Sequence, residues 1–447
     1  MAVYTDVGFD EADRLLARPP EAQRTPRIVR STQCWNAWRD GELRAHDGLV
    51  RAGHPLIAAT AGDVLPIVYG RGRVQAKIWF YVRSGGGGTF WFWICAGPIE
   101  AVVKAYNNGK EAPGDWTFDY SLGDENPTFP PIAGGTPPFA QTFPFTAWGR
   151  LVVPDSYDGG DVGPLEFEIK GKKVWDPREN RIANSNDFST GWASNYTGPD
   201  EIVTGQLDPL CQHNASLLRF SGTENDWYLN LGGLPVSAGD YITVSLDVKV
   251  PDGAPDAGFR IEAVNQGPPQ EQTIRNVVAQ DWWQPIEVTH HCTVDGTPTL
   301  VISFGFGTYL PTDLLVHNAQ LSLTSYRTGR CITVGVPILQ HVAYSRVLPL
   351  VLLDVLHGLP TGDPDNGGYG LDEILVGSFG DSATIAEQAV GDDIAWGVDA
   401  ILKASGQTVA QSIDKLRAVA PCACYVANDV WRCDIETGCG KPELHFD

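Results

Sequence analysis

The chain has 447 residues, of which 54 are Asp or Glu and 32 are Lys or Arg, so its formal net charge is −22. A charge of this size and sign repels nucleic-acid phosphates and anionic lipid head groups, and we expect neither as a partner. The length allows two to four domains, and 43% hydrophobic residues punctuated by 49 Gly and 32 Pro are typical of many short strands.

The N-terminal region predicts a short helix at Phe9–Ala17, which ends at Pro19-Pro20. It lacks the basic start and apolar block of a signal peptide, so we expect synthesis and folding in the cytosol. The longest apolar run, Val347–Leu356, is too short to cross a bilayer, and we expect no membrane span.

Residues 72–83 and 89–95 form the clearest predicted hairpin, with Gly85–Gly88 as its turn. Large aromatic residues occupy both faces of its strands, more than the core of one small hairpin can hold. We therefore expect part of this set to pack against a second subunit. The set consists of Trp79, Tyr81, Phe90, Trp91, Phe92 and Trp93.

Residues 111–142 are rich in Pro and Gly and predict a long loop. Thr146–Pro154 and Leu165–Val174 follow as a predicted strand pair.

Residues 181–328 differ in character, because short strands with alternating apolar and polar residues recur about every ten positions. Seven or eight such strands suit a β-sandwich of two sheets. The predicted strands are 216–221, 227–231, 241–250, 259–263, 284–292, 299–306 and 314–324.

The last part of the chain predicts a buried helix at Leu348–His357 and amphipathic helices at Ser382–Gln388 and Thr408–Ala418. A hairpin at Cys424–Cys433 follows them. The order of these segments indicates a discontinuous outer region, residues 1–180 and 329–447, interrupted by an inserted module at 181–328. The fold class expected is mainly β, with α+β outer domains and an inserted, jelly-roll-like β-sandwich.

Six segments of the outer region, taken in order and including the short loop Asn107–Lys110, resemble the tail hub or tip attachment family of long-tailed bacteriophages, which is related to protein J of lambda-like phages. The other five are Pro66–Val74, Cys95–Val102, Gly171–Arg178, Pro349–Leu356 and Tyr369–Asp372. Asp372 departs from the glycine that the family has there. Family members also continue past the position of Asp447, which leaves open whether another protein completes the hub.

The resemblance implies a virion protein of the tail tip or baseplate, assembled in the host cytoplasm. Such hubs are homotrimers that close the tail tube and join ring-forming distal tail proteins, the tape-measure protein and tail fibres to host-binding parts. Residues 181–328 resemble the sandwiches of carbohydrate-binding modules, which implies contact with host-surface polysaccharide.

Aromatic rings of the module are the candidate glycan contacts, because a sugar ring stacks on the face of an indole or phenol. Core packing is the competing interpretation for each ring. The candidates are Trp192, Trp227, Tyr228, Trp282 and Trp283.

The C-terminal cysteines are the candidate metal ligands. A two-residue turn at Asn428-Asp429 would place Cys424 opposite Cys433, with Cys422 on the same face and Cys439 able to fold back. We expect no cofactor unless these four thiolates hold an iron–sulfur cluster or zinc. The alternatives are reduced, half-buried thiols or a Cys424–Cys433 disulfide.

Enzyme signatures are absent, since the sequence contains no G-x-S-x-G, H-E-x-x-H or G-x-x-x-x-G-K-[ST] motif. We expect a structural protein with no catalytic residues. The alternatives are a secreted or surface polysaccharide-active enzyme with a binding module, and a lectin-like adhesin.

Overall fold

The computed structural model describes residues 65–435, with gaps in that range. The gaps are 85–86, 124–145, 156–161, 190–191, 195–198, 211, 221–224, 231–234, 253, 255–256, 305–312, 335, 358–368, 388, 391–392, 395–396, 403–408 and 418–421. The predicted helix Phe9–Ala17 lies outside the described residues.

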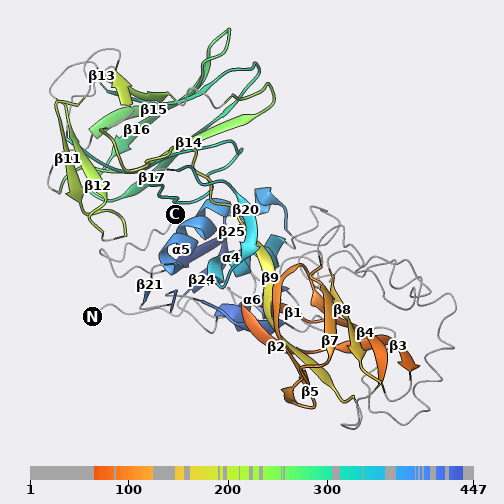
Figure 1. Ribbon diagram of the computed structural model, residues 1–447. Coiled ribbons are helices and arrows are strands. Elements are labelled where there is room, and N and C mark those ends of the chain that lie inside the picture. The colour runs from red at the N-terminus through yellow and green to blue at the C-terminus, as the bar shows by residue number, and fades with distance from the viewer. Residues whose placement is uncertain are drawn as a thin grey trace, which may run out of the picture. The chain divides into compact units, whose positions relative to one another are not determined.

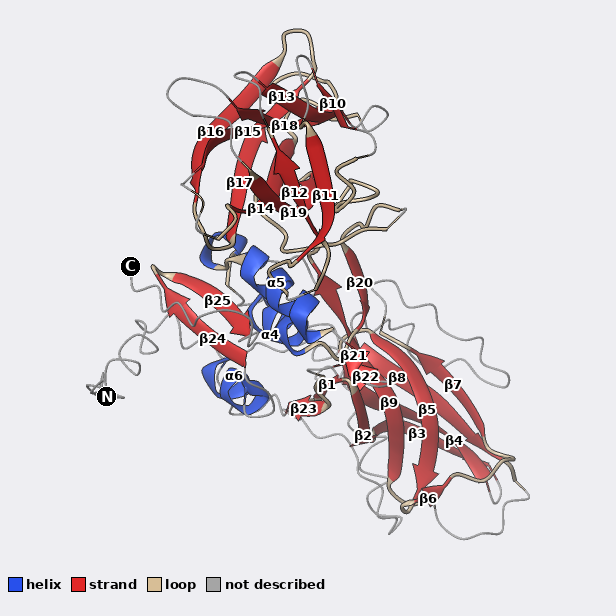
Figure 2. Ribbon diagram, turned by 90° about the vertical axis from the view of Figure 1, so that its left-hand side faces the viewer, coloured by secondary structure: helices blue, strands red, loops and turns tan. Residues whose placement is uncertain are grey.

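The chain divides into two compact units, each made of separate segments. Unit 1 contains residues 1–175, 342–374 and 389–432, and unit 2 contains residues 176–341, 375–388 and 433–447. Helices and strands are labelled in Figure 1 and distinguished by colour in Figure 2.

Unit 1 contains two main sheets. The first has the order β23-β1-β4-β8-β7, with β3 paired to β4. Its strands are β1 (Ile67–Tyr69), β3 (Lys77–Ser84), β4 (Gly87–Ala96), β7 (Thr117–Ser121), β8 (Thr146–Val153) and β23 (Ala400–Leu402). The second has the order β2-β9-β5-β6, with β20 paired to β9. Its strands are β2 (Arg71–Gln75), β5 (Ile99–Asn107), β6 (Lys110–Glu111), β9 (Leu165–Asp176) and β20 (His341–Tyr344).

Apolar side chains of both sheets form the core of unit 1, where Phe92 stacks on Phe167 with ring centroids 4.8 Å apart. Helix α4 (Leu348–His357) is buried along its first nine residues, as expected of a helix that is apolar on every side. The remaining described elements are η2 (Leu371–Glu373), β21 (Ala389–Val390), β22 (Asp393–Ile394), α6 (Val409–Arg417), β24 (Cys422–Ala427) and β25 (Val430–Ile435).

Unit 2 contains a β-sandwich of two five-stranded sheets and the helix α5 (Val376–Ala386). The β15 sheet has the order β10-β13-β18-β15-β16, and the β14 sheet has the order β11-β12-β19-β14-β17. Their bounds are β10 (Trp192–Ser194), β11 (Glu201–Gln206), β12 (Ala215–Arg219), β13 (Asn225–Asn230), β14 (Tyr241–Lys249), β15 (Ala257–Asn265), β16 (Glu271–Ala279), β17 (Gln284–His291), β18 (Pro298–Phe304) and β19 (Leu314–Ser322).

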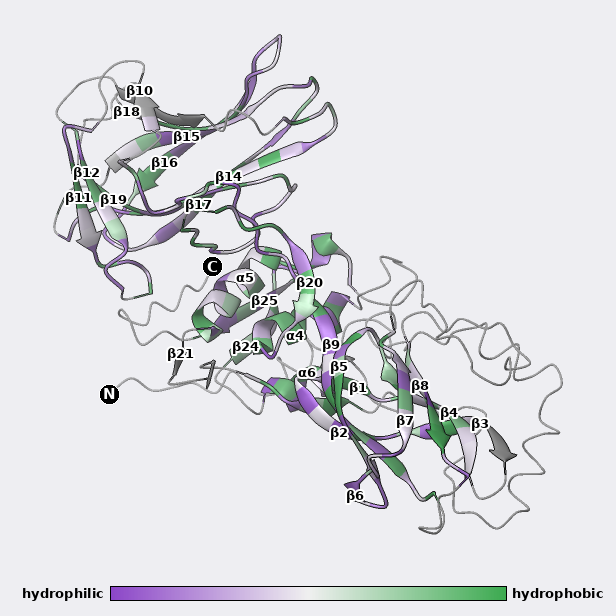
Figure 3. Cartoon of the chain, in the orientation of Figure 1, coloured by the Kyte–Doolittle hydropathy of each residue, from purple (hydrophilic) through white to green (hydrophobic). Residues whose placement is uncertain are grey.

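The sandwich core lies between the two sheets. Ile242, Val244 and Leu246 of β14 alternate with polar residues and are 0–1% exposed, and Leu300 and Ile302 of β18 are 0% exposed. Because side chains two apart lie on one face of a strand, this alternation faces each strand's apolar residues inward. The pattern can be followed in Figure 3. The mainly β fold class with a sandwich is thus confirmed.

Three local predictions were wrong. The predicted strand 72–83 is two strands, because β2 pairs with β9 while β3 pairs with β4 in the other sheet. The strands β8 and β9 do not pair with each other but belong to different sheets. The predicted loop 111–142 contains β7, which pairs with β8. In each case a long-range pairing decides the structure, and such pairings leave no local signal.

The predicted C-terminal hairpin is confirmed. Asn428 and Asp429 both have positive φ, 52° and 60°, as a two-residue type I′ connection requires. The predicted helix Leu348–His357 matches α4, and Thr408–Ala418 matches α6 within one residue at each end. Helix α5 begins six residues before the predicted Ser382.

Candidate functional site

A buried triad in unit 1 joins three of the segments that resemble the hub family. Tyr69 Oη donates a hydrogen bond to Asp354 Oδ2 at 2.5 Å, and Lys172 Nζ lies 2.5 Å from the same oxygen. Tyr69, Lys172 and Asp354 are 1%, 5% and 2% exposed. Tyr69 ends β1, Lys172 lies in β9 and Asp354 lies in α4, so one carboxylate connects two sheets and a helix.

Two glycines of the segments that resemble the hub family lie close to this triad. A Cβ on Gly171 would lie 2.2 Å from the carbonyl oxygen of Val68. At Gly97, φ is +86° and a Cβ would lie 3.1 Å from the side chain of Lys172. The close approach of the Val68 backbone to Gly171, and of the Lys172 side chain to Gly97, therefore depends on residues without a Cβ.

The hydrogen bond and the ion pair of the triad stabilise the fold of unit 1. Burial raises the pKa of Tyr69 well above its ordinary value, and the negative charge and hydrogen bond of Asp354 raise it further. The phenol therefore stays protonated and serves as a donor. Removing either partner of Asp354 would leave charge or polarity buried without compensation, which is strongly destabilising.

The aromatic residues predicted for an oligomer interface divide into two groups. Phe90, Trp91 and Phe92 are 3%, 4% and 0% exposed, and a ring buried in its own chain has no surface to offer a second subunit. Trp79 and Trp93 are half-buried and stack on each other with centroids 5.9 Å apart. The side chain of Tyr81 lies outside the described residues. The interface prediction therefore narrows to the Trp79–Trp93 pair.

The five predicted glycan-binding rings do not share one surface. Trp192 stacks on the buried Phe188 at 5.6 Å and packs against the sandwich core. Trp283 precedes β17 of the other sheet, where it meets the His317 ring edge-on at 6.3 Å. Trp282 also precedes β17 and donates its indole N–H to Gln280 Oε1 at 2.9 Å.

Trp227 and Tyr228 are adjacent in β13, and only their backbone register is described. Trp227 pairs with Ile302, a core position, while Tyr228 pairs with Val301 of the opposite face. Of the five candidate positions, only Tyr228 is paired with a residue of the outer face of the β15 sheet.

The outer face of the β14 sheet is occupied by the chain's own segments. Thr243 Oγ1 donates to the carbonyl oxygen of Thr324 at 2.6 Å, and Gln320 Nε2 donates to the carbonyl oxygen of Glu179 at 2.7 Å. Arg330 Nε donates to Asp247 at 2.8 Å. The segments before β10 and after β19 therefore cover this face.

The outer face of the β15 sheet carries a recessed polar cluster. Ser303 Oγ donates to Glu262 Oε1 at 3.1 Å, and Arg260 lies on the same face, 3.5 Å from that oxygen. Thr299 lies in the same strand as Ser303, and its buried hydroxyl oxygen has no hydrogen-bond partner among the described residues. Ile274, opposite Glu262 in β16, is 40% exposed. Polar groups beside an exposed apolar side chain are the pattern of a site for a hydroxylated ligand.

The residue types of this cluster explain why the sequence did not reveal it. Glu, Ser and Thr in alternation with apolar residues are typical of any strand that has one solvent-exposed face. The one available signal was the alternation of Thr299, Val301 and Ser303 with Leu300 and Ile302.

The predicted metal ligands Cys422, Cys424 and Cys433 are 5%, 2% and 0% exposed. Among the described residues, no three His, Cys, Asp or Glu side chains form a group that could hold a metal ion. Cys439 lies outside the described residues. The four-cysteine site stays a prediction that metal analysis of the full chain would test.

No protein-family model matches this sequence, and no curated protein matches it. Among solved structures, the enzymatically active domain of tailspike protein 4 of bacteriophage CBA120 matches with 12% identity and a TM-score of 0.26, over 33% of this chain and 22% of that one. This chain thus spans about a fifth of that tailspike structure.

Two carbohydrate-binding modules also match. The CBM22-1 xylan-binding domain of Paenibacillus barcinonensis Xyn10C has 13% identity and a TM-score of 0.26, over 34% of this chain and 97% of that one. A family 11 module from Clostridium thermocellum has 12% identity and a TM-score of 0.24, over 32% and 95%. Similarities of this size carry no information about the ligands of this chain. Among the described residues, no helix is long and apolar enough to span a membrane.

Proposed function

We propose that this chain is a structural component of the distal tail of a long-tailed bacteriophage, and that its sandwich binds host-surface glycan through the outer face of the β15 sheet. In this proposal unit 1 belongs to a trimeric hub that joins ring-forming tail proteins to host-binding parts. The chain binds and assembles, and it performs no catalytic step.

The triad supports the hub part of the proposal. Tyr69, Lys172 and Asp354 come from three segments that carry the resemblance to tail hubs, and Tyr69 and Lys172 each contact the same buried oxygen of Asp354 at 2.5 Å. The residues that suggest the family are therefore also residues that hold unit 1 together.

The unpaired Thr299 hydroxyl, on the same outer face of the β15 sheet as Glu262 and Ser303, is the observation that carries the glycan part. A buried hydroxyl without a partner costs stability in the free protein, and a ligand hydroxyl would satisfy it. Glu262 and Ser303 supply an acceptor and a hydroxyl on the same face, and Arg260 supplies donors. The net charge of −22 favours a neutral glycan over an anionic one.

Two experiments test the two parts separately. Immunogold electron microscopy of intact phage, with an antibody against residues 182–328, should label the tail tip; labelling along the tube or on the capsid would overturn the hub assignment. A glycan array probed with the full-length chain should show binding to polysaccharide of the host surface. An absence of binding to every host polysaccharide, with tip labelling intact, would leave the sandwich a reinforcing role alone.

A further inference from the structure

Lys172 of β9 and Asp354 of α4 bring an amine and a carboxyl group together where water is excluded. Nζ of Lys172 lies 2.5 Å from Oδ2 of Asp354, and both residues are buried. An amine at this distance from one carboxyl oxygen lies about 3–3.5 Å from the carboxyl carbon, which is the range from which two oriented groups react. The pair therefore has the geometry of a nucleophile facing a carbon that it can attack.

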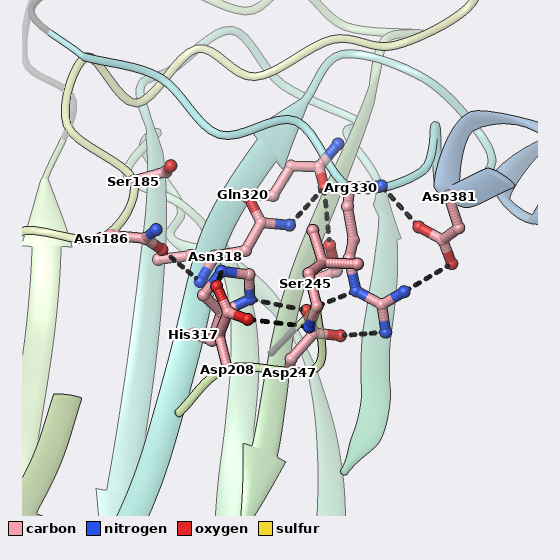
Figure 4. A network of polar contacts seen from close by, with 12 residues as sticks. Ser185, Asn186, Asp208, Ser245, Asp247, His317, Asn318, Gln320, Arg330 and Asp381 are labelled. Carbon is pink, nitrogen blue, oxygen red and sulfur yellow. Dashed lines mark hydrogen bonds and ion pairs between the residues drawn. The ribbon is translucent and has the colours of Figure 1, made fainter. Parts of the chain in front are cut away.

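The two oxygens of Asp354 are held less evenly than those of Asp247, a buried carboxylate of unit 2. Arg330 donates to both oxygens of Asp247, with Nε at 2.8 Å from Oδ2 and a terminal nitrogen at 3.2 Å from Oδ1 (Figure 4). In Asp354, both Tyr69 and Lys172 contact Oδ2, and Oδ1 has no hydrogen-bond partner among the described residues. An unpartnered oxygen costs more in a buried, charged carboxylate than in a neutral amide, so loss of the charge would relieve this arrangement.

Tyr69 supplies a path for protons at the same oxygen. Its Oη donates a hydrogen bond to Oδ2 of Asp354 at 2.5 Å. Burial, followed by the negative charge and hydrogen bond of Asp354, raises the pKa of this phenol well above its ordinary value, so the phenol stays protonated. It can pass a proton to Oδ2 as it receives another, and the amine of Lys172 beside it is the source.

We propose that Lys172 and Asp354 condense to an isopeptide bond, an amide between the two side chains, with Tyr69 as the proton relay. Proton transfer across the contact first gives a neutral amine and a neutral acid. The Nζ lone pair then forms a bond to Cγ of Asp354, the bond from Cγ to Oδ2 breaks, and Oδ2 leaves as water. Both hydrogens of that water come from Nζ, one directly and one through Tyr69, whose own hydroxyl is restored.

Burial favours the amide over the two ions. An ion pair inside the protein carries a desolvation penalty that a neutral amide does not have, and the exclusion of water removes the reactant of the reverse reaction. Lys104 and Glu111 form a comparison within the same unit, because they lie 3.2 Å apart but their side chains are 47% and 67% exposed. We expect that pair to stay ionic.

The bond would join two segments that lie on either side of the sandwich in the sequence. Lys172 and Asp354 are 182 positions apart, and the strands from β10 to β19 all lie between them. The cross-link therefore closes a covalent loop that contains the sandwich, and a force that enters before Lys172 and leaves after Asp354 bypasses that module. The reaction occurs once in each chain and turns over no substrate, so it adds no enzyme activity to the proposed function.

Mass spectrometry of the denatured, full-length chain tests the proposal. The natural chain should weigh less than its sequence by the mass of one water molecule. After trypsin digestion, a branched peptide should join Lys172 to Asp354, with no cleavage after Lys172 because trypsin does not cut at an acylated lysine. A chain that keeps its full mass after days of storage in the folded state, or a loss of water located elsewhere, would overturn the proposal.

Three variants complete the test. In Tyr69→Phe the relay is lost, so the bond should form about a hundredfold or more slowly, as samples taken at intervals after a short expression would measure. Lys172→Arg keeps the charge but has no amine and should keep its full mass; if it does not fold, the branched peptide of the natural chain still decides. Glu111→Gln is the matched control and should lose water as the natural chain does. Equal rates in Tyr69→Phe and the natural chain would contradict the relay, and a branched peptide at the exposed Lys104 would show that burial does not direct the reaction.

Discussion

Tyr69 donates its phenolic hydrogen to Asp354 across 2.5 Å, although 285 positions separate the two residues in the chain. All of unit 2's sandwich lies between them in sequence. The contact is completed by Lys172, and it belongs to one compact unit that the chain enters, leaves and enters again. An intervening module can fold by itself under such an arrangement, because the outer segments find each other through their own buried contacts.

Asp354→Asn should destabilise unit 1 by about 3–5 kcal/mol, because it leaves the ammonium of Lys172 buried without a counter-charge. Tyr69→Phe should cost less, about 1.5–3 kcal/mol, since it removes one hydrogen bond to a charged group. Urea unfolding followed by tryptophan fluorescence measures both. Glu111→Gln, in the exposed Lys104–Glu111 ion pair of the same unit, is the matched control and should change little. Equal effects of Asp354→Asn and the control would show that the triad does not hold the unit together.

Simultaneous Trp79→Gln and Trp93→Gln should convert the assembled protein to monomers without unfolding it. The two rings are half-buried and stacked, so an oligomer would cover the part that solvent now reaches. Sedimentation velocity should show a trimer for the natural chain and a monomer for the double variant. Trp282→Gln, a half-buried indole of unit 2, should leave the trimer intact. A natural chain that sediments as a monomer at every concentration would refute the interface.

Acid should act on unit 2 through Glu271. Hydrogen bonds from the Thr293 hydroxyl and the Thr293 backbone lower the pKa of Glu271 from 4.5 to about 2, although desolvation opposes them. A carboxyl group whose pKa is lower in the folded chain than in the unfolded chain stabilises the fold at pH values above its unfolded pKa. This stability is lost as the pH falls through its folded pKa. Stability should thus decline between pH 4.5 and about 2. In Thr293→Val the decline in stability should be shallower. If stability depends on pH in the same way in Thr293→Val and in the natural chain, the Thr293 hydroxyl does not stabilise ionised Glu271.

Cys95 and Cys331 should resist alkylation in the folded chain. Burial raises the pKa of both thiols from 9.0 to about 12. At pH 8 the thiolate, which is the reactive form, should therefore be about a thousandfold scarcer than in the unfolded chain. Iodoacetamide labelling followed by peptide mass spectrometry measures the rate at each cysteine, with urea-unfolded protein as the control. Equal rates in the two states would contradict the buried positions of these thiols.

Local sequence pattern predicted those elements whose stability is local. The alternation of Ile242, Val244 and Leu246 identified β14, and an all-apolar run identified α4. Strand β16 was missed because it is an edge strand whose residues, such as Gln272, Arg275 and Asn276, are mostly exposed and show no alternation. Nothing near Gln75 signals that the chain changes sheets there.

The candidate glycan site could not be predicted for a related reason. Aromatic residue type directed attention to Trp192 and Trp283, yet Trp192 packs against the core and Trp283 lies beside His317 of the other sheet. The polar residues of the β15 face became distinguishable only through register, since Glu262 and Ser303 are 41 positions apart. Where the flanking segments lie over the sandwich depends on long-range contacts, which no local sequence pattern reveals.

Thr299→Val should weaken glycan binding while leaving the free protein as stable as before or more so. Valine has nearly the shape of threonine, and the hydroxyl that it replaces is buried without a partner in the described residues, so its loss removes a desolvation cost and no internal hydrogen bond. A glycan that satisfies this hydroxyl would lose one hydrogen bond, and affinity should fall by about fivefold to tenfold. Calorimetric titration with the glycan found on the array, together with urea unfolding, measures both quantities.

Thr243→Val is the opposite control for that experiment. Thr243 lies in the other sheet, and its hydroxyl donates to the carbonyl oxygen of Thr324 at 2.6 Å and lies 2.8 Å from the Thr289 hydroxyl. Its loss should destabilise the sandwich by about 1 kcal/mol and leave glycan affinity unchanged. If Thr299→Val binds as the natural chain does, or if the two variants affect affinity alike, the ligand does not contact the β15 face.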